Sequence, residues 1–463
     1  MTEGLLLNDT IAAISTPVGK SGIGIIRLSG QGALALADKV FVSAKARRPS
    51  RCLSHTIHYG WVKDGTETID EVLLTVMRAP RTYTREDIVE INCHSGIVVL
   101  RKILQLLLRR GARLAAPGEF TRRAYLSGRI DLAQAEAVLD VINSQTEAAL
   151  GQALGQLKGR LSRKIQALRQ DILAILTQLE LAIDFSDQDI PPMPREELLK
   201  KSKKIFQTLQ DFLDSAARGM LLRQGLTCVI CGKTNVGKSS LLNALLKKER
   251  AIVTPMPGTT RDALEETIDL KGIPLRLVDT AGIIRGRNLA EREAVKRSRQ
   301  YIRQADVVLL VLDASRRLSA EDLAIAREIS AKAALVVLNK EDLPAKINAA
   351  RVEKLLPGRL IQRVSARRGR GLKKLEQELA EFIWQGRAGT NGEVLVTNLR
   401  HQEALKKAAR FIQQAIKAVK ANQGLELVAL EVKAAKDSLG EIIGQIDNQA
   451  VLERVFAQFC IGK

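Results

Sequence analysis

Several features are scarce in this sequence of 463 residues, and each scarcity narrows its chemistry. Aromatic residues make up only 3% of the chain, which argues against a platform on which single-stranded bases stack. The five cysteines are an odd number, which argues against a disulfide framework, and the four histidines form no recognisable metal-binding pattern. The longest apolar runs are far shorter than a membrane span, and Met1–Gly4 begins no secretory signal. We therefore expect a cytoplasmic protein without membrane association.

Three of the cysteines lie at positions that indicate their environment. Cys228 and Cys231 form a Cys-x-x-Cys pair, but residues three apart on a predicted strand point to opposite faces, so we expect buried core thiols. Cys460 lies close to the chain end, where we expect an accessible thiol.

Charge of one sign dominates. The formal net charge of +21 makes nucleic acid the favoured class of partner, because Lys and Arg neutralise phosphates and release counterions. The alternative is a set of solvated helix faces in a generally basic proteome.

The sequence contains a complete phosphate-binding loop, Gly232–Ser239 (Gly-Lys-Thr-Asn-Val-Gly-Lys-Ser). It lies between an apolar run that predicts a strand, residues 226–231, and an amphipathic stretch that predicts a helix, residues 240–248. In this context backbone N–H groups converge on phosphate oxygens, Lys238 neutralises the β/γ charge, and the Ser239 hydroxyl can bind Mg²⁺. The loop therefore predicts nucleotide binding.

Three later motifs indicate that the nucleotide is GTP. One apolar strand ends in Asp279–Gly282 (Asp-Thr-Ala-Gly), which can place a carboxylate near Mg²⁺ and a glycine near the γ-phosphate. Another ends in Asn339–Asp342 (Asn-Lys-Glu-Asp), where the Asp342 carboxylate can accept two hydrogen bonds that guanine offers and adenine does not. Ser365-Ala366 follows a further strand, where a base-contacting loop is expected. Four motifs at the carboxyl ends of strands predict a GTP site.

For the catalysis of GTP hydrolysis, the sequence offers several candidate residues. Thr260, within Pro257–Asp262, is a candidate for the switch threonine that senses Mg²⁺ and the γ-phosphate. Ile283 stands where Ras-like GTPases carry the water-orienting glutamine, and an isoleucine cannot orient water. Glu291 and Glu293 are the nearest acidic candidates, and their alternative interpretation is a solvated helix start.

The remaining chain divides into a mixed segment and helical segments. Up to about residue 120, residues 71–76 and 87–91 predict strands and residues 97–110 a helix. Helical periodicity covers 131–218, broken by the segment Pro-Pro-Met-Pro at 191–194, and returns from 402 onward. The nucleotide-binding unit thus interrupts a helical domain, which is tolerated when its entry and exit points lie close in space.

These motifs, together with both ends of the chain, resemble the MnmE (TrmE) family of tRNA-modification GTPases over essentially the whole length. The most specific matching segments lie outside the GTPase unit; they are Asp9–Ala13, Gly22–Gly30, Ala116–Ala124, Asp131–Ala137 and Phe459–Lys463.

The resemblance implies a multidomain protein that combines α/β and α+β folds. Its expected domains are a folate-binding, dimerising α+β domain over residues 1–122, a helical domain in two parts over 123–219 and 387–463, and an inserted Ras-like α/β G domain over 220–386. The second helical part ends in the Cys-Ile-Gly-Lys motif.

The resemblance also implies a function. Such proteins are homodimers that act with the flavoprotein MnmG, here expected as a heterotetramer, on the wobble uridine of certain tRNAs. They add a carboxymethylaminomethyl group to C5 of that base with a one-carbon unit from 5-formyl- or 5,10-methylene-tetrahydrofolate. Which tRNAs are modified, and whether ammonium or glycine is the amine donor, stays open.

Site residues follow by resemblance in the same way. Arg27, Glu90, Arg129 and Lys463 are expected at the folate, with Arg129 in place of the expected lysine. Cys460 is a candidate catalytic thiol; the alternative is a thiol that only anchors the tail.

In the G domain, the family uses K⁺ where other GTPases use an arginine finger. Expected K⁺ ligands are Asn235, Thr254, Met256 and Thr259, and expected Mg²⁺ ligands are Ser239 and Thr260. Glu291 is placed as the water-orienting glutamate, but Glu293-Ala294 departs from the usual Ile-Gly, which leaves Glu293 open. The residues expected to bind GTP are Asn235, Val236, Gly237, Lys238, Ser239, Ser240, Thr254, Thr259, Thr260, Asp279, Thr280, Ala281, Gly282, Asn339, Lys340, Asp342, Ser365 and Ala366.

Two other functions compete. A ribosome-assembly GTPase of the Era or EngA type has a similar GTPase unit, but the split helical domain and the Cys-Ile-Gly-Lys ending argue against it. A scaffold that binds nucleotide without turnover is disfavoured by the intact Asn235, Thr260 and Asp279.

Overall fold

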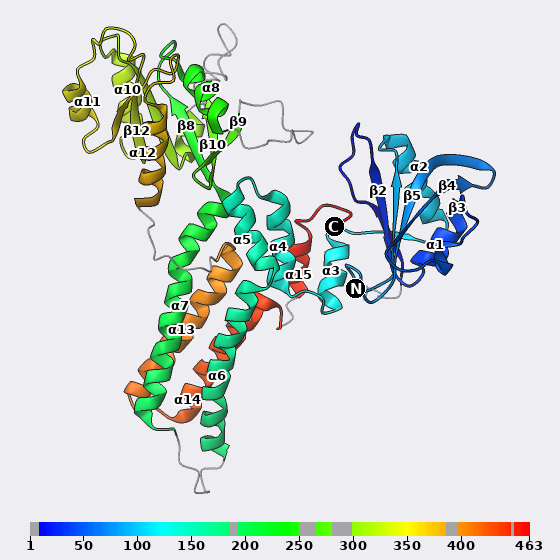
Figure 1. The fold of residues 1–463 in the computed structure, drawn as a ribbon. Coiled ribbons are helices and arrows are strands. Elements are labelled where there is room, and N and C mark those ends of the chain that lie inside the picture. The colour runs from blue at the N-terminus through cyan, green and yellow to red at the C-terminus, as the bar shows by residue number, and fades with distance from the viewer. Residues whose placement is uncertain (1–8, 185–192, 250–264, 280–298, 386–395, 446–448) are drawn as a thin grey trace. The chain divides into compact units, whose positions relative to one another are not determined.

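The computed structural model describes residues 9–184, 193–249, 265–279, 299–385, 396–445 and 449–463. Contacts divide it into two compact units, one of residues 1–139, 157–165 and 440–463, the other of residues 140–156 and 166–439 (Figure 1). The four predicted domain ranges divide the chain more finely than these two units, and they stay a prediction. Within the described ranges, no helix is long and apolar enough to cross a membrane.

The first unit is built on a seven-stranded sheet. Its strand order is β3 (Phe41–Ser43), β4 (Thr56–Asp64), β5 (Glu67–Met77), β6 (Ile88–Cys93), β2 (Gly24–Ser29), β1 (Ile11–Ile14) and β7 (Arg113–Leu114). Neighbours are antiparallel except β1 and β7. Helices α1 (Ala33–Val40) and α2 (Ile97–Arg109) bury apolar side chains, such as Leu36 and Ile103, against the inward-facing residues of the sheet. The predicted strands and helix of this region are confirmed.

A second core of the same unit joins both ends of the chain. Ala124 of α3 (Glu119–Leu126) and Ala135 of α4 (Leu132–Asn143) share a cluster with Phe456 of α15 (Gln449–Phe456) and with Phe459. The C-terminal tail therefore belongs to the N-terminal unit.

The second unit contains a six-stranded sheet. Its order is β13 (Ile361–Arg363), β12 (Ala334–Asn339), β11 (Val307–Asp313), β8 (Leu226–Cys231), β10 (Ile273–Asp279) and β9 (Glu265–Leu270), all parallel except the β9–β10 hairpin. Its helices are α8 (Lys238–Glu249), α10 (Ala320–Glu328), α11 (Ala349–Leu355) and α12 (Leu372–Gln385). Separate cores cover the two faces, and Cys228 lies in one and Cys231 in the other. Both thiols are buried, as predicted, and burial raises the pKa of Cys231 to about 12.

Helices that precede and follow this sheet in the sequence pack together. They are α5 (Glu147–Leu157), α6 (Arg160–Asp184), α7 (Arg195–Gln224), α13 (Leu399–Lys420) and α14 (Leu425–Ile443). Helix α7 runs along α13 (Figure 1), and Arg169 Nε of α6 donates to the Lys436 carbonyl of α14 at 3.2 Å. The predicted helical stretches are confirmed, and so is the expected mixture of α/β and α+β folds.

Candidate functional site: a nucleotide loop and a cavity closed by the C-terminal tail

The phosphate-binding loop connects β8 to α8 and depends on unusual backbone angles. Gly232, Asn235 and Gly237 have φ of +142°, +64° and +95°. A Cβ at Gly237 would overlap the side-chain amide of Asn339, so only glycine fits between this loop and β12. The loop is therefore held tightly over the carboxyl end of the sheet.

Lys238 lies inside this loop and is only 6% exposed. Its Nζ donates to the carbonyl oxygens of Gly232 and Lys233, at 2.8 and 2.7 Å. A buried ammonium group needs hydrogen-bond acceptors. The two carbonyl oxygens fill that need here, in the place that phosphate oxygens would take. Burial lowers the pKa of Lys238, and a phosphate group would favour its charged form.

Ser239 and Asp279 converge from different elements. Ser239 lies in the first turn of α8, and its Oγ donates to Oδ2 of Asp279, at the end of β10, at 2.7 Å. Asp279 is fully buried. Hard oxygen donors from a hydroxyl and a carboxylate at one point fit Mg²⁺.

Asn339 and Lys340 fasten the loop to β12. The amide of Asn339 donates to the Val236 carbonyl at 2.9 Å, and its Oδ1 accepts from Ala366 N at 3.1 Å. Lys340 Nζ donates to the Asn235 carbonyl at 2.8 Å. The motifs predicted for phosphate and for base are thus directly bonded to each other.

Asp313 is a member of this network that the sequence did not indicate. It ends β11, and its Oδ2 lies 2.7 Å from Lys340 Nζ. Burial alone would raise the pKa of Asp313, but hydrogen bonds from Lys340 and Ser315 outweigh it and lower that pKa. Its position after a strand, like that of Asp279, was the available signal.

The residues expected to contact the base are already joined by a hydrogen bond. Ser365 Oγ donates to Oδ1 of Asp342 at 2.6 Å, and this hydrogen bond lowers the pKa of the Asp342 carboxyl. Asp342 is therefore an ionised acceptor. Arg368 Nε lies 3.9 Å from its other oxygen.

The structure brings most of the expected GTP residues to one edge of the sheet, including Ser240 in the first turn of α8. Asn235 is exposed, so its amide is accessible to a cation. The other expected residues lie outside the described residues; they are Thr254, Met256, Thr259, Thr260, Thr280, Ala281, Gly282, Glu291 and Glu293.

The first unit contains a cavity of about 210 Å³ beside β2 and β6. Its lining includes Arg27, Glu90 and Lys463, three of the four residues expected at a folate. Arg27 and Glu90 lie directly opposite each other on paired strands, and their side chains form an ion pair at 2.7 Å. The cavity therefore offers a guanidinium donor and a carboxylate acceptor side by side.

The C-terminal tail reaches this cavity through its backbone. The Gly462 carbonyl accepts from Arg27 Nη1 at 3.3 Å and from Ser15 Oγ at 3.1 Å. Gly462 has φ of +95°, and a Cβ there would overlap the Ile14 carbonyl. Close packing of Gly462 on β1 is what brings Lys463 to the cavity.

Arg129 does not line the cavity but lies next to it. Its guanidinium stacks over the ring of Tyr83, which does line it, at 4.7 Å from the centroid. Burial raises the pKa of Tyr83, and its hydroxyl lies 3.0 Å from Thr121 Oγ1. Arg129 thus contacts one wall.

Cys460 is exposed, as predicted, and it is not a lining residue of the cavity. Its carbonyl accepts from Gly118 N and Lys463 N, both at 3.4 Å.

A buried charge cluster in this unit was not predicted. Arg123 of α3 is 1% exposed, and its guanidinium contacts carboxylates of Asp9, Glu86 and Glu119. The same helix carries Phe120, over whose ring Arg27 lies at 5.6 Å from the centroid. The charge cluster therefore lies on the helix that contacts Arg27, a lining residue of the cavity.

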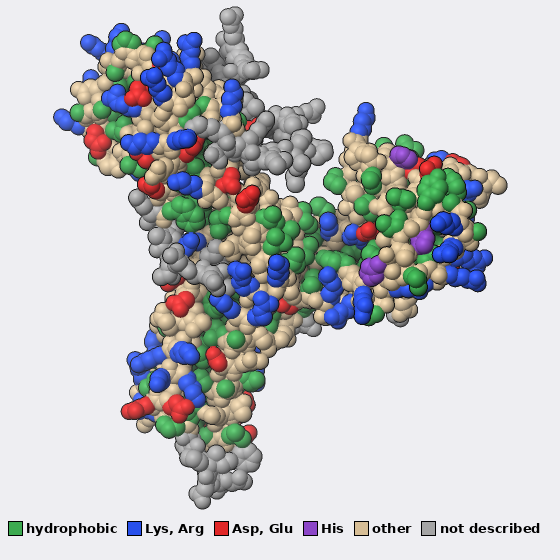
Figure 2. Space-filling view, in the orientation of Figure 1, with side chains coloured by type: hydrophobic (Ala, Val, Ile, Leu, Met, Phe, Trp, Pro, Cys, Tyr) green, Lys and Arg blue, Asp and Glu red, His purple; other side chains and the backbone are tan. Residues whose placement is uncertain are grey.

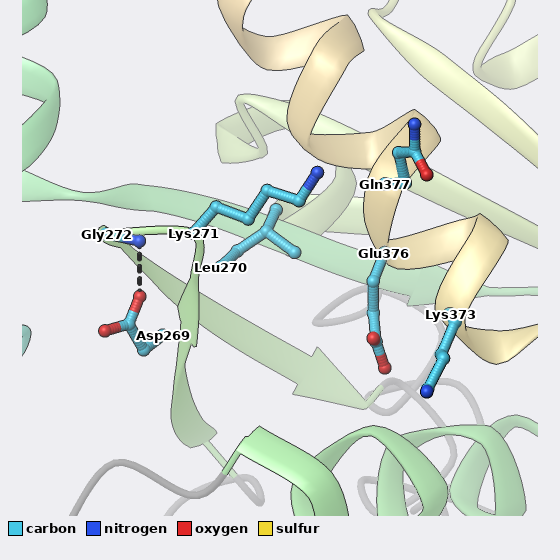
Figure 3. Close-up of a pocket in the computed structure, with 7 residues that line it drawn as sticks. All are labelled: Asp269, Leu270, Lys271, Gly272, Lys373, Glu376 and Gln377. Atoms are coloured by element: carbon cyan, nitrogen blue, oxygen red, sulfur yellow. Dashed lines mark hydrogen bonds between the residues drawn. The ribbon is translucent and has the colours of Figure 1, made fainter.

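A second hollow, of about 450 Å³, lies between the β9–β10 turn and α12 (Figure 3). Its lining residues are Asp269, Leu270, Lys271, Gly272, Lys373, Glu376 and Gln377. Figure 3 shows the turn closed by a hydrogen bond from Gly272 N to Asp269 Oδ1, at 2.6 Å. The lining of this hollow carries charges of both signs and includes none of the expected site residues, so we assign the hollow no role.

Comparison with known proteins gives matches over the whole chain. Residues 10–129 match the family model of the GTP-binding protein TrmE N-terminus, and residues 132–460 match that of the MnmE helical domain. Two relatives named tRNA modification GTPase MnmE, from Alkaliphilus metalliredigens and Alkaliphilus oremlandii, are 45% and 46% identical, covering 99% of this chain and all of theirs. A crystal structure of Aquifex aeolicus Era is 28% identical, covering 40% of this chain and 67% of that one, with a TM-score of 0.29.

Proposed function

The chain belongs to the MnmE (TrmE) family, and from this premise we propose that it is a GTP hydrolase that modifies tRNA. The observation that carries the proposal is the convergence of Lys238, Ser239, Asp279 and Asp342 at one sheet edge. Full-length similarity to the curated relatives leaves the Era- or EngA-type alternative without support.

At the phosphate end, Lys238 would exchange its two carbonyl acceptors for β- and γ-phosphate oxygens. Ser239 and Thr260 would bind Mg²⁺ with Asp279 close by, and the ion supplies positive charge to the phosphates. The buried Asp279 carboxylate would keep the Ser239 hydroxyl oriented.

Hydrolysis would use K⁺, with Asn235, Thr254, Met256 and Thr259 as its ligands. The exposed Asn235, held at positive φ by the loop, supports this assignment. Glu291 would orient the attacking water, since Ile283 cannot.

The cavity of the first unit would hold part of a tetrahydrofolate, 5-formyl or 5,10-methylene. About 210 Å³ is less than the roughly 300–1,000 Å³ of pockets that enclose a whole drug-sized ligand. The Arg27–Glu90 pair would bind an edge of the folate that carries both hydrogen-bond acceptors and donors, with Lys463 and Arg129 nearby. Cys460 would then be placed by the tail close to the one-carbon unit.

A homodimer would form through the outer face of β3, β4 and β5. Val42, Ile57, Tyr59 and Leu73 are exposed on these strands, an unusual apolar surface for a sheet that faces water (Figure 2). The protein would act in the cytoplasm with MnmG, in a heterotetramer, to add the carboxymethylaminomethyl group to the wobble uridine. We propose the domain division 1–122, 123–219, 220–386 and 387–463 for this assembly.

Mass spectrometry of tRNA nucleosides tests the proposal. Cells that lack this protein should lose the modified wobble uridine, and expression of the chain should restore it. Restoration should fail for Lys238→Ala, because the loop lysine is needed for GTP. Unchanged nucleosides in cells without the protein would exclude the proposed function.

A further inference from the structure

The first unit carries an exposed cationic loop at the junction of α1, β3 and the short 3₁₀ helix η1 (Pro49–Arg51). Its five cations are Lys39, Lys45, Arg47, Arg48 and Arg51, all exposed. Figure 2 shows Lys and Arg side chains gathered over this part of the unit. Among the described residues, no carboxylate forms an ion pair with any of the five.

The one acidic side chain in this stretch is already engaged. Asp38 accepts hydrogen bonds from both the backbone N and the Oγ of Ser50. From Lys39 to Lys63 the chain contains no Asp or Glu. The loop thus presents positive charge without local neutralisation, whereas solvated helix faces usually mix both signs.

Hydrogen bonds from Arg78 hold the backbone of this loop in place. The Arg78 guanidinium donates to the carbonyls of Cys52, at 3.0 Å, and Ser50, and its backbone N donates to Ser54 Oγ at 2.9 Å. Pro49 is buried, and η1 packs against α1. The half-buried Arg78 therefore holds the backbone, while Arg47, Arg48 and Arg51 are exposed.

Backbone geometry holds two of the exposed arginines on one turn. Arg48 is the extended N-cap of η1 and Arg51 is its last residue, and Arg51 N donates to the Arg48 carbonyl at 2.9 Å. Arg47 adjoins them. Guanidinium groups bind phosphate oxygens in bidentate fashion, and preorganisation lowers the entropy lost on binding.

We propose that the cationic loop binds the phosphate backbone of the RNA substrate. This proposal rests on the proposed function in tRNA modification and locates one contact surface for that tRNA. The loop would position the RNA without reading its sequence, because contacts to phosphate carry no base information.

The test is tRNA binding by the full-length protein, measured by fluorescence anisotropy at several KCl concentrations. R47Q/R48Q/R51Q should lower the slope of log affinity against log salt by about 2 to 3, since each lost phosphate contact contributes about 0.7–0.9. The affinity at about 0.1 M salt should fall roughly 10²-fold. GTP hydrolysis should be unchanged, which shows that the variant is folded.

K102Q/R109Q/R110Q is the matched control. It removes three cations from the same unit, but these are paired with Glu67 or Asp64. Its slope should change by less than about 1.

Three results overturn the proposal. If both triple variants have the same slope, the cationic loop makes no special contact, while the proposed function stands. If the wild-type protein binds no tRNA at low salt, the loop is not an RNA site, and nucleoside analysis then decides whether tRNA is still modified. If anionic phosphatidylserine vesicles bind the wild type but not R47Q/R48Q/R51Q, and tRNA binding is equal, the loop binds membranes instead.

Discussion

Asp342→Asn is the substitution that most directly tests guanine recognition. The carboxylate is ionised and fixed by Ser365 Oγ at 2.6 Å, so its position is set before the base arrives. A carboxylate has about four lone-pair sites, and Ser365 uses one, which leaves acceptors for both guanine donors. Asparagine keeps the size and turns one acceptor into a donor.

The expected loss follows from these contacts. A hydrogen bond to a charged partner contributes about 1.5–3 kcal/mol, and asparagine loses one of the two. Its new N–H donor also faces a guanine donor, and leaving that group unsatisfied costs about another 1–3 kcal/mol. At 1.4 kcal/mol for each factor of ten, GTP should bind about 10²–10⁴-fold more weakly. XTP, in which a carbonyl replaces the 2-amino group, should bind at least about tenfold better to the variant than to the wild type, because the new amide can donate to it.

Competition against a fluorescent GDP analogue measures these affinities for GTP, XTP and ATP. Arg368→Gln is the control; it keeps the carboxylate and removes an exposed cation at 3.9 Å, so GTP affinity should change less than about fivefold. Because the pKa of Asp342 is already lowered, titration of this carboxyl should contribute no change in GTP affinity from pH 5 to 8. An Asp342→Asn variant that binds GTP normally and gains nothing for XTP would refute the assignment of Asp342.

Three further predictions concern turnover and modification. GTP hydrolysis should be faster in KCl than in NaCl of equal ionic strength, and Asn235→Ala should abolish that difference; equal wild-type rates in both salts would exclude a K⁺ role. Glu291→Ala should lower kcat roughly 10²-fold with little change in nucleotide affinity, whereas Glu293→Ala should not; the reverse result would move the water-orienting role to Glu293. Cys460→Ser should retain GTP hydrolysis and lose wobble-uridine modification in the nucleoside assay; normal modification would leave the thiol only a structural role.

The nucleotide site could be predicted largely from the sequence because its chemistry is local. Asp279 ends an apolar strand, and Lys238 and Asp342 lie in or just after the loops that follow such strands. Parallel strands bring their carboxyl ends to one edge of the sheet. Asp313 was missed because it lies in no recognisable motif. Its role is apparent only from the 2.7 Å contact to Lys340, on the neighbouring strand.

The cavity of the first unit has a different origin, because backbone packing between remote segments builds it. The Arg27–Glu90 pair follows from strand register, and the approach of Lys463 follows from a glycine that packs on β1. Neither periodicity nor composition encodes such a contact between residues so far apart, and only the resemblance placed the tail there. Since Gly462 cannot carry a side chain in this position, any substitution there would displace Cys460 and Lys463 together. Their separate roles can therefore be distinguished only by changes to the two side chains that leave Gly462 intact.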